Sequence, residues 1–211
     1  MFANYSLESS LGHQLSVNQM HQLEKLYQLV IEGNKTQNLT RITTVPDFWE
    51  KHIWDSLRGI MAWWQIPEIK LLDIGTGAGF PGLPIAIAQP SWQVTLLDST
   101  QKKIRFVELA IQALGLDNAM AEVGRAEQHG QTYDLVVVRA VAGASVCATY
   151  ALPRLQARGQ AVLYRGTWTE LEEQELIAVS DRLGGVVEQI EQFHTPLTQS
   201  LRHLVILRKV S

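Results

Sequence analysis

The sequence predicts an α/β protein built on a mostly parallel sheet, and three features of the chain support this interpretation. From residue 67 onward, short apolar runs alternate with longer amphipathic runs, which is the pattern of strand–helix–strand units. A glycine-rich segment, residues 75–82, follows the first apolar run. The last two apolar runs, residues 186–193 and 201–207, have no helix between them and predict an antiparallel hairpin that closes the sheet edge.

Residues 1–66 predict a helical N-terminal extension, and residues 67–211 predict the core that carries the sheet. In the extension, apolar side chains recur at helical spacing from Met20 to Ile31. Ser16 with Gln19 three residues later resembles a capping box at the start of this helix. We expect the extension and the core to pack as one compact unit.

The extension is expected to contain two helices. Gly33 and Asn34 supply stop signals for the first helix. The second helix is expected to begin near Asp47 and to continue through Trp54 to Trp64. The helical spacing of these two tryptophans favours packing in the core over a surface for stacking bases.

In the core, most strands are expected to be followed by a helix. The expected strands are residues 69–74, 94–97, 119–123, 135–138 and 159–164. The expected helices are residues 81–88, 102–114, 145–155 and 171–183. Right-handed connections between parallel strands would then cover both faces of the sheet with helices.

The composition is that of one soluble globular unit, because 46% of the 211 residues are apolar and the formal net charge is −3. No apolar run approaches the roughly 20 residues that a membrane-spanning helix needs. Residues 1–14 lack the cationic start and apolar run of a secretory signal. The single cysteine, Cys147, is expected to be a buried helix residue, and the six histidines are scattered singly. We therefore expect a monomeric cytoplasmic protein that holds no metal.

The segment from Leu71 to Gly82 carries the strongest functional signal. An apolar strand ends in glycines and a helix begins at Pro81, so the backbone can approach a ligand where the helix N-terminus favours negative charge. In a parallel α/β sheet, such a ligand lies in the crevice at the carboxyl ends of the strands. The spacing of Gly77, Gly79 and Gly82 also fits the G-x-G-x-x-G fingerprint of dinucleotide-binding proteins.

Further candidate ligand contacts follow the other strands. Asp98 ends the second expected strand, where it could accept two hydrogen bonds from a ribose diol or merely cap the next helix; the upstream glycines favour the ribose role. Residues 124–127 follow the third strand, where an adenine would reach. Arg139 directly follows a buried apolar run and needs a partner, either an acid such as Asp73 or Asp134 or a ligand carboxylate. Its position at the carboxyl edge of the sheet favours the ligand.

Several motifs together resemble one family closely. The pattern Asp73-x-Gly75-x-Gly77-x-Gly79 is similar to the first motif of S-adenosylmethionine-dependent methyltransferases. With the other motifs, the chain resembles the bacterial 16S ribosomal RNA (guanine-N7) methyltransferases of the small subunit, also called the glucose-inhibited division protein B family. The matching segments are Leu96–Ser99, Arg105–Phe106, Val138–Ala140, Arg202–Leu204, Asn34–Thr40 and His52–Ser56. Two positions depart from the family: Gly33 replaces a common tryptophan, and Arg165 replaces a common lysine.

The resemblance implies a Rossmann-like class I methyltransferase fold, with a mostly parallel seven-stranded sheet and an antiparallel C-terminal strand. It implies methyl transfer from S-adenosylmethionine to N7 of a guanine in a conserved loop of 16S ribosomal RNA, with S-adenosylhomocysteine as the other product. The cofactor contacts that it implies are Gly75, Phe80, Ala126, Glu127 and Arg139. The glycine turn and the second strand add Gly77 and Asp98. Because guanine N7 carries a lone pair and no proton, no side chain is expected to act as a general base.

The charge balance of 18 Lys and Arg against 21 Asp and Glu means that RNA would be bound by a local basic patch. The candidates for this patch are Lys35, Arg41, His52, Arg165, Arg202 and His203. Each could instead be an ordinary solvated charge, as is expected of Lys102, Lys103 and Arg105 on their helix. Two other functions stay open: a nicotinamide-dependent oxidoreductase, and a non-catalytic ribosome-assembly module that binds RNA.

Overall fold

The computed structural model describes residues 10–210 and contains the alternating strands and helices that the sequence predicts. The strands are β1 (Lys70–Ile74), β2 (Gln93–Asp98), β3 (Ala119–Val123), β4 (Tyr133–Arg139), β5 (Leu155–Arg165), β6 (Gly185–His194) and β7 (Leu201–Lys209). The helices are α2 (Val17–Gln37), α3 (Val45–Phe48), α4 (Asp55–Arg58), α5 (Gly82–Ala88), α6 (Gln101–Leu114), α7 (Ala144–Ala151) and α8 (Glu170–Arg182).

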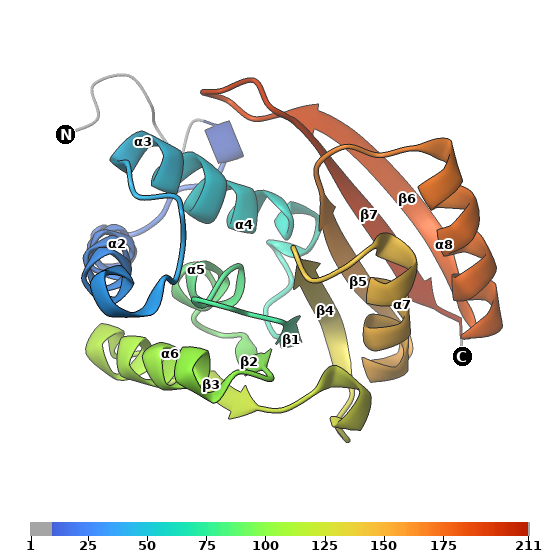
Figure 1. Ribbon diagram of the computed structural model, residues 1–211, viewed down its shortest axis with the longest axis horizontal. Helices are drawn as coiled ribbons and strands as arrows, with labels where there is room; N and C mark the ends of the chain where they lie inside the picture. The colour runs from blue at the N-terminus through green and yellow to red at the C-terminus, as the bar shows by residue number, and fades with distance from the viewer. Residues whose placement is uncertain (1–9, 211) are drawn as a thin grey trace.

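The strands form one seven-stranded sheet in the order β3-β2-β1-β4-β5-β7-β6 (Figure 1). Within residues 10–210, β7 alone runs antiparallel to its neighbours, β5 and β6. The predicted mostly parallel sheet and C-terminal hairpin are therefore confirmed. The two strands of the hairpin do not follow chain order in the sheet. β7 lies between β5 and β6, and β6 is the edge strand.

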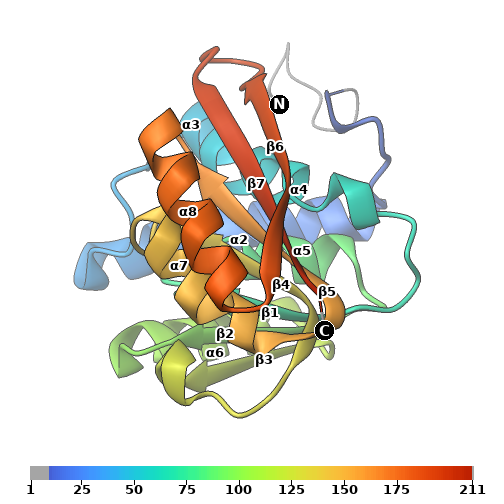
Figure 2. The same cartoon turned by 90° about the vertical axis from the view of Figure 1, so that its right-hand side faces the viewer.

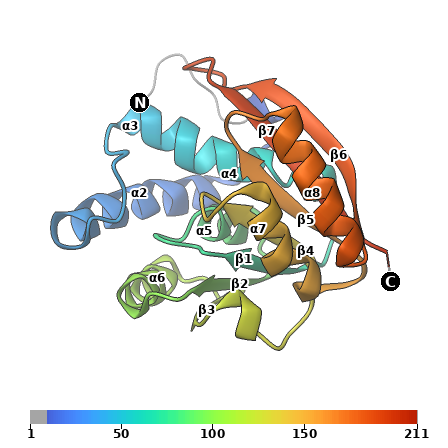
Figure 3. The same ribbon diagram turned by 45° about the vertical axis from the view of Figure 1, so that its right-hand side comes forward.

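Helices cover both faces of the sheet, as Figures 2 and 3 show. Successive strand residues point to opposite faces, so Leu71 belongs to one hydrophobic cluster and Leu72 to the other. The first cluster includes side chains from α2, α3, α5 and α6, and the second includes side chains from α7 and α8. The N-terminal helices share the first cluster with the sheet, so the core positions their side chains. The predicted boundary between the N-terminal extension and the core, at residues 66 and 67, stays a prediction.

Helix α2 begins as predicted, with reciprocal hydrogen bonds between Ser16 and Gln19. The predicted end at Gly33 is wrong, because α2 continues to Gln37 and ends at Asn38 in the left-handed conformation. A Cβ atom on Gly33 would lie 2.8 Å from a ring atom of Phe106 on α6. Position 33 therefore needs a glycine because α2 and α6 approach closely there. This glycine lies within α2 and does not end it.

The second helix of the extension differs from the prediction at both ends. It begins at Val45, continues through a π-helical segment at Trp49–Trp54, and ends at Arg58. Gly59 then passes over Tyr164, whose hydroxyl group would collide with a side chain at this position. Trp64 is partly buried and packs against the first cluster, as predicted, and Trp63, which was not predicted, is more deeply buried because the helical spacing stops at Arg58.

Three further expectations concern single segments. Trp54 is buried as predicted, and so is Cys147 on α7. The expectation for residues 1–14 falls largely outside the described residues, which begin at Ser10. No helix within residues 10–210 is long and apolar enough to span a membrane.

Candidate active site

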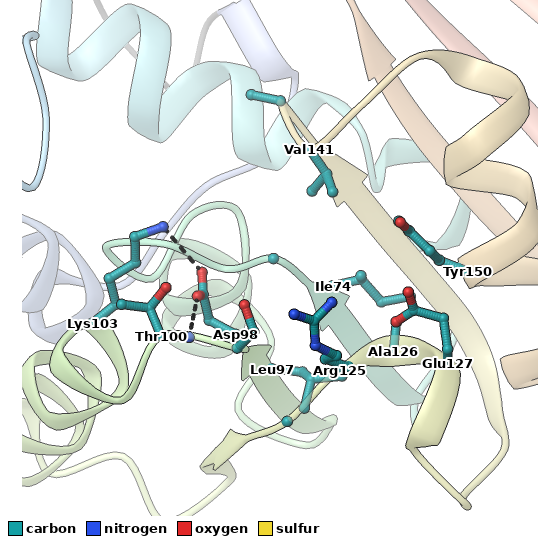
Figure 4. A pocket seen from close by; sticks show the side chains of 14 residues that line it. Ile74, Leu97, Asp98, Thr100, Lys103, Arg125, Ala126, Glu127, Val141 and Tyr150 are labelled. Carbon is teal, nitrogen blue, oxygen red and sulfur yellow. Dashed lines mark hydrogen bonds and ion pairs between the residues drawn. The ribbon is translucent and has the colours of Figure 1, made fainter.

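A cavity of about 290 Å³ lies at the carboxyl ends of β1, β2, β3 and β4 (Figure 4). Its lining comprises residues 74–75, 97–100, 124–127 and 140–141, together with Lys103 and Tyr150. In Figure 4, Asp98, Thr100 and Lys103 lie on one side of it, and Glu127 and Tyr150 lie on the other. The predicted position of the ligand crevice is thus where the structure has a cavity.

The glycine turn is held by the acid that precedes it. Asp73 Oδ2 accepts hydrogen bonds from Thr76 Oγ1 at 2.7 Å and from the Gly82 amide at 2.8 Å. Gly75 has a φ of 71°, and a Cβ atom there would lie 2.5 Å from Val141. Burial raises the pKa of Asp73 to about 6, against the hydrogen bonds that lower it. The turn therefore rests on a fully buried carboxyl group.

Asp98 links β2 to both the glycine turn and the start of α6. Its Oδ1 atom accepts a hydrogen bond from the Thr100 amide at 2.8 Å, and Oδ2 accepts one from the Gly77 amide at 3.0 Å. Lys103 is exposed on α6, as expected, and its Nζ atom also lies 3.4 Å from the same carboxylate, a contact that was not predicted. The sequence indicates this contact, because Lys103 lies in the first turn of α6, five residues after Asp98. The ribose role of Asp98 stays a prediction.

The seven expected cofactor residues fall into two groups. Gly75, Asp98, Ala126 and Glu127 line this first cavity. Gly77, Phe80 and Arg139 do not belong to its lining, and their cofactor contacts stay predictions. Arg125, from the segment 124–127 expected near the adenine, also lines the cavity. Val141 and Tyr150 line it but were not singled out, because their direction depends on how the loop after β4 turns.

A second cavity, of about 570 Å³, adjoins the first, and Ala140 lines both. Four of the six basic candidates line this cavity, namely His52, Arg165, Arg202 and His203. Arg139 also lines it. Lys35 and Arg41 are not among the lining residues. Lys35 is on the exposed last turn of α2, where it pairs with Glu32 at 2.5 Å.

Arg139 extends from the end of β4 to the N-terminal extension. Its Nη1 atom donates hydrogen bonds to the Lys51 carbonyl at 2.9 Å and to Asp55 Oδ2 at 3.3 Å. Neither of the acids considered from the sequence, Asp73 and Asp134, is its ion-pair partner. The partner is Asp55, three residues after His52 on the neighbouring helical segment, a pairing that sequence reasoning missed.

His52 is neutral, so the prediction that it supplies positive charge is wrong. Burial and the nearby Arg139 lower the pKa of His52 to about 3. Arg139 Nη2 lies 3.2 Å from His52 Nδ1, which must accept because a guanidinium can only donate. The ring proton is therefore on Nε2, which donates to Thr40 Oγ1 at 2.9 Å.

The other basic candidates in the second cavity also have contacts within the protein. Arg165 donates to the Ala142 carbonyl at 2.7 Å and to Glu172 at 2.8 Å. His203 Nδ1 lies 2.6 Å from the Gly166 carbonyl. Arg202 is more available, since its side chain is 27% exposed. The contribution of these residues to RNA binding stays a prediction.

The sheet order, the glycine turn after β1 and the acid at the end of β2 define a class I methyltransferase fold. Solved structures are similar to this fold. A methyltransferase structure from Bacillus halodurans superposes with a TM-score of 0.60 at 15% identity, covering 74% of this chain and 99% of that one.

The chain belongs to the GidB family, described as rRNA small subunit methyltransferase G, whose family model matches residues 19–205. A relative from Gloeobacter violaceus named ribosomal RNA small subunit methyltransferase G is 52% identical, over 97% of this chain and 84% of the relative. A relative of the same name from Nostoc punctiforme is 50% identical, over 97% and 88% of the two chains. Membership of this methyltransferase family favours neither a nicotinamide-dependent oxidoreductase nor a non-catalytic ribosome-assembly module.

Proposed function

We propose that this protein transfers the methyl group of S-adenosylmethionine to N7 of a guanine in the 16S RNA of the small ribosomal subunit. The observation that carries the proposal is the meeting of two cavities at Ala140, directly after β4. The first has the glycine turn and the acid of a cofactor site, and the second is basic and within the size range of ligand cavities. The names of the family and of its relatives support ribosomal RNA as the substrate.

The residues of the first cavity fit S-adenosylmethionine. The absence of a side chain at Gly75 leaves the backbone accessible, since a Cβ atom there would fill the space beside Val141. Asp98 Oδ1 accepts one hydrogen bond within the protein and retains capacity for a ribose hydroxyl. Ala126 and Glu127 border the region assigned to adenine. When bound, the cofactor supplies an electrophilic methyl group on a sulfonium ion.

The side chains of the second cavity orient the base and exclude water. Guanine N7 attacks through a lone pair and loses no proton, so alignment and desolvation supply most of the rate enhancement. His52 is neutral with both ring nitrogens engaged, and His203 contacts Gly166 and Gln192. We expect the methylation rate to stay constant from neutral to mildly alkaline pH, as it would without a general base.

The RNA is proposed to contact the basic side chains at the mouth of the second cavity, with Arg202 as the most exposed arginine of the candidates there. Replacing Arg202 by Glu should weaken methylation and reduce its dependence on salt, because one phosphate contact is lost. Unchanged methylation and salt dependence would remove Arg202 from this surface. The monomeric state and cytoplasmic location stay predictions.

The proposed function is tested with methyl-labelled S-adenosylmethionine and small subunits from cells that lack this protein. Reductive and aniline cleavage, which cuts RNA at N7-methylguanine, then locates the label. A single labelled guanine in 16S RNA is the expected result. Cofactor binding without any label in the naked RNA, a partial particle or the complete subunit would contradict the proposed substrate.

A further inference from the structure

The second cavity contains one acidic side chain among its described lining residues, Asp55, which enters from α4. The charged residues around it are basic, and the guanidinium groups of Arg139 and Arg202 lie on either side of its carboxylate. The Asp55 side chain is 10% exposed. Burial disfavours this carboxylate and raises the pKa of Asp55, which Arg139 and Arg202 oppose, so hydrogen bonds to its oxygen atoms are needed to stabilise the charged form.

The hydrogen bonds within the protein leave acceptor capacity on Asp55. Its Oδ2 atom accepts a single hydrogen bond, from Arg139 Nη1 at 3.3 Å, which is long for a charge-assisted bond. Its Oδ1 atom lies 3.8 Å from Arg202 Nε, beyond hydrogen-bond distance. An ionised carboxylate can accept about four hydrogen bonds. Asp55 therefore presents unfilled acceptor positions to a ligand in this cavity.

The complement of a carboxylate is a pair of adjacent donors, and guanine has this pair at its Watson–Crick edge. There, N1–H and the N2 amino group are neighbouring donors. Adenine and cytosine pair a donor with an acceptor, and uracil has one donor between two acceptors. The guanidinium groups beside Asp55 could also donate to guanine O6, which adjoins N1.

The position of N7 is consistent with this orientation. The N2 amino group is attached to C2, which lies across the six-membered ring from C5, the atom that carries N7. A guanine held at its Watson–Crick edge by Asp55 would thus have N7 on the opposite side of the base. Ala140 lines both cavities, so the base and the cofactor methyl group would meet beside it.

We propose that Asp55 is a specificity-determining residue, which accepts hydrogen bonds from N1–H and the N2 amino group of the target guanine. This inference rests on the proposed function, because it assigns the substrate edge that the second cavity recognises. It gives α4 of the N-terminal extension a direct contact with the substrate base.

The test is a cycle that changes the residue and the base together. The labelled guanine is first located in the natural RNA, and a 16S RNA is then ligated with inosine at that position. Inosine keeps N7, O6 and N1–H but lacks the N2 amino group. The methylation efficiency, kcat/KM, is measured for the wild-type protein and for Asp55→Asn on both substrates. Asp181→Asn, at an exposed position on α8, is the matched control.

Wild-type protein and Asp181→Asn should lose about tenfold in kcat/KM on inosine, as expected for one lost hydrogen bond to a charged group. Asp55→Asn should be weaker on guanine by tenfold or more and should methylate both substrates with similar efficiency. Any effect of inosine on the reactivity of N7 cancels in this comparison. Calorimetry should show cooperative thermal unfolding of Asp55→Asn, which establishes that the variant is folded.

An equal guanine-to-inosine ratio for Asp55→Asn and wild type would overturn the inference, because Asp55 would then have only a structural role. If Asp55→Asn does not fold, Asp55→Ser takes its place in the same comparison, and a guanine-to-inosine ratio equal to that of wild type again overturns the inference. Failure of the proposed function is distinct, since no N7 label would then form in the natural RNA.

Discussion

His52 and Phe80 stack in parallel, with their ring centroids 4.3 Å apart and an angle of 12° between the ring planes. One ring comes from the π-helical segment of the N-terminal extension, and the other ends the glycine-rich turn. Arg139 lies over the Phe80 ring at 5.7 Å and donates to His52. The three side chains thus join the N-terminal extension to the glycine-rich turn and to the end of β4, and His52 and Arg139 line the second cavity.

Protonation of His52 should destabilise the fold. The pKa of His52 is about 3 in the folded protein and 6.5 in an unperturbed histidine, so the unfolded chain binds the proton more tightly. The contribution of neutral His52 to the free energy of unfolding is therefore fully present above pH 6.5, and it is lost as the pH decreases towards 3. Between pH 6.5 and 5 the loss should be about 2 kcal/mol in the free energy of unfolding.

Urea unfolding of wild type and His52→Gln at pH 7.5 and 5 measures this contribution. Wild type should lose more stability than His52→Gln on acidification. His21→Gln, an exposed position on α2, serves as the control and should behave like wild type. An identical pH dependence in all three proteins would show that His52 is not held neutral.

Asp73 should have the opposite pH dependence. Its pKa is about 6 in the folded protein against 3.8 for an unperturbed aspartate, so the folded state keeps the proton to higher pH. Stability on account of Asp73 is highest below pH 3.8 and falls by about 3 kcal/mol as the pH rises through 6. The free energy of unfolding of Asp73→Asn relative to wild type should therefore increase between pH 4 and 7. A constant difference across this range would contradict the raised pKa.

Gly75→Ala should impair cofactor binding more than folding. The residue has a φ of 71°, which is strained for alanine, and the added methyl group would meet Val141. We expect at least a tenfold loss of affinity for S-adenosylhomocysteine by calorimetry, because the turn can relieve the ~1–2 kcal/mol strain of a left-handed alanine by leaving the conformation that binds the cofactor. Gly130→Ala is the control, because its Cβ atom would meet open space. Wild-type affinity in Gly75→Ala would show that this turn does not hold the cofactor.

Glu50 should stabilise the tip of the β6–β7 hairpin. This fully buried carboxylate accepts hydrogen bonds from the amides of Leu197 and Thr198 and from the Thr198 hydroxyl. Burial alone raises the pKa of Glu50, but these hydrogen bonds outweigh it and the net pKa is lowered. The carboxylate therefore contributes stability above pH 4.5 that is lost as the pH falls through its lowered pKa.

Glu50→Gln should lower the free energy of unfolding at pH 7 by about 1–3 kcal/mol, because an amide cannot replace both acceptor oxygens. Hydrogen exchange should report faster exchange of the Leu197 and Thr198 amides in this variant. Glu108→Gln, at an exposed position on α6, is the control. Protection of both amides at the wild-type level would contradict the contact.

The sheet, its hairpin and the position of the first cavity could be predicted because they follow from local patterns. The central strands are buried on both faces and therefore appear as short continuous apolar runs, and glycines mark the turn where the backbone takes a positive φ. The same local reasoning misread Gly33, because a glycine required by the nearby Phe106 ring has the same appearance in sequence as one that ends a helix.

The charge states around the second cavity could not be predicted from local patterns. Asp55 and Arg139 are 84 residues apart, and their contact depends on how the N-terminal extension packs on the sheet. A histidine among basic residues suggests positive charge, but the guanidinium of Arg139 and burial keep His52 neutral. Its protonation is set by tertiary contacts.

The place of β7 inside the sheet orders the assembly of the two cavities during synthesis. β6 pairs only with β7 among the described strands, so it cannot join the sheet until residues 201–209 have been made. The first cavity needs no residue beyond Tyr150, whereas the second needs Arg202 and His203. The residues that line the smaller cavity are therefore all synthesised before the last wall of the larger one.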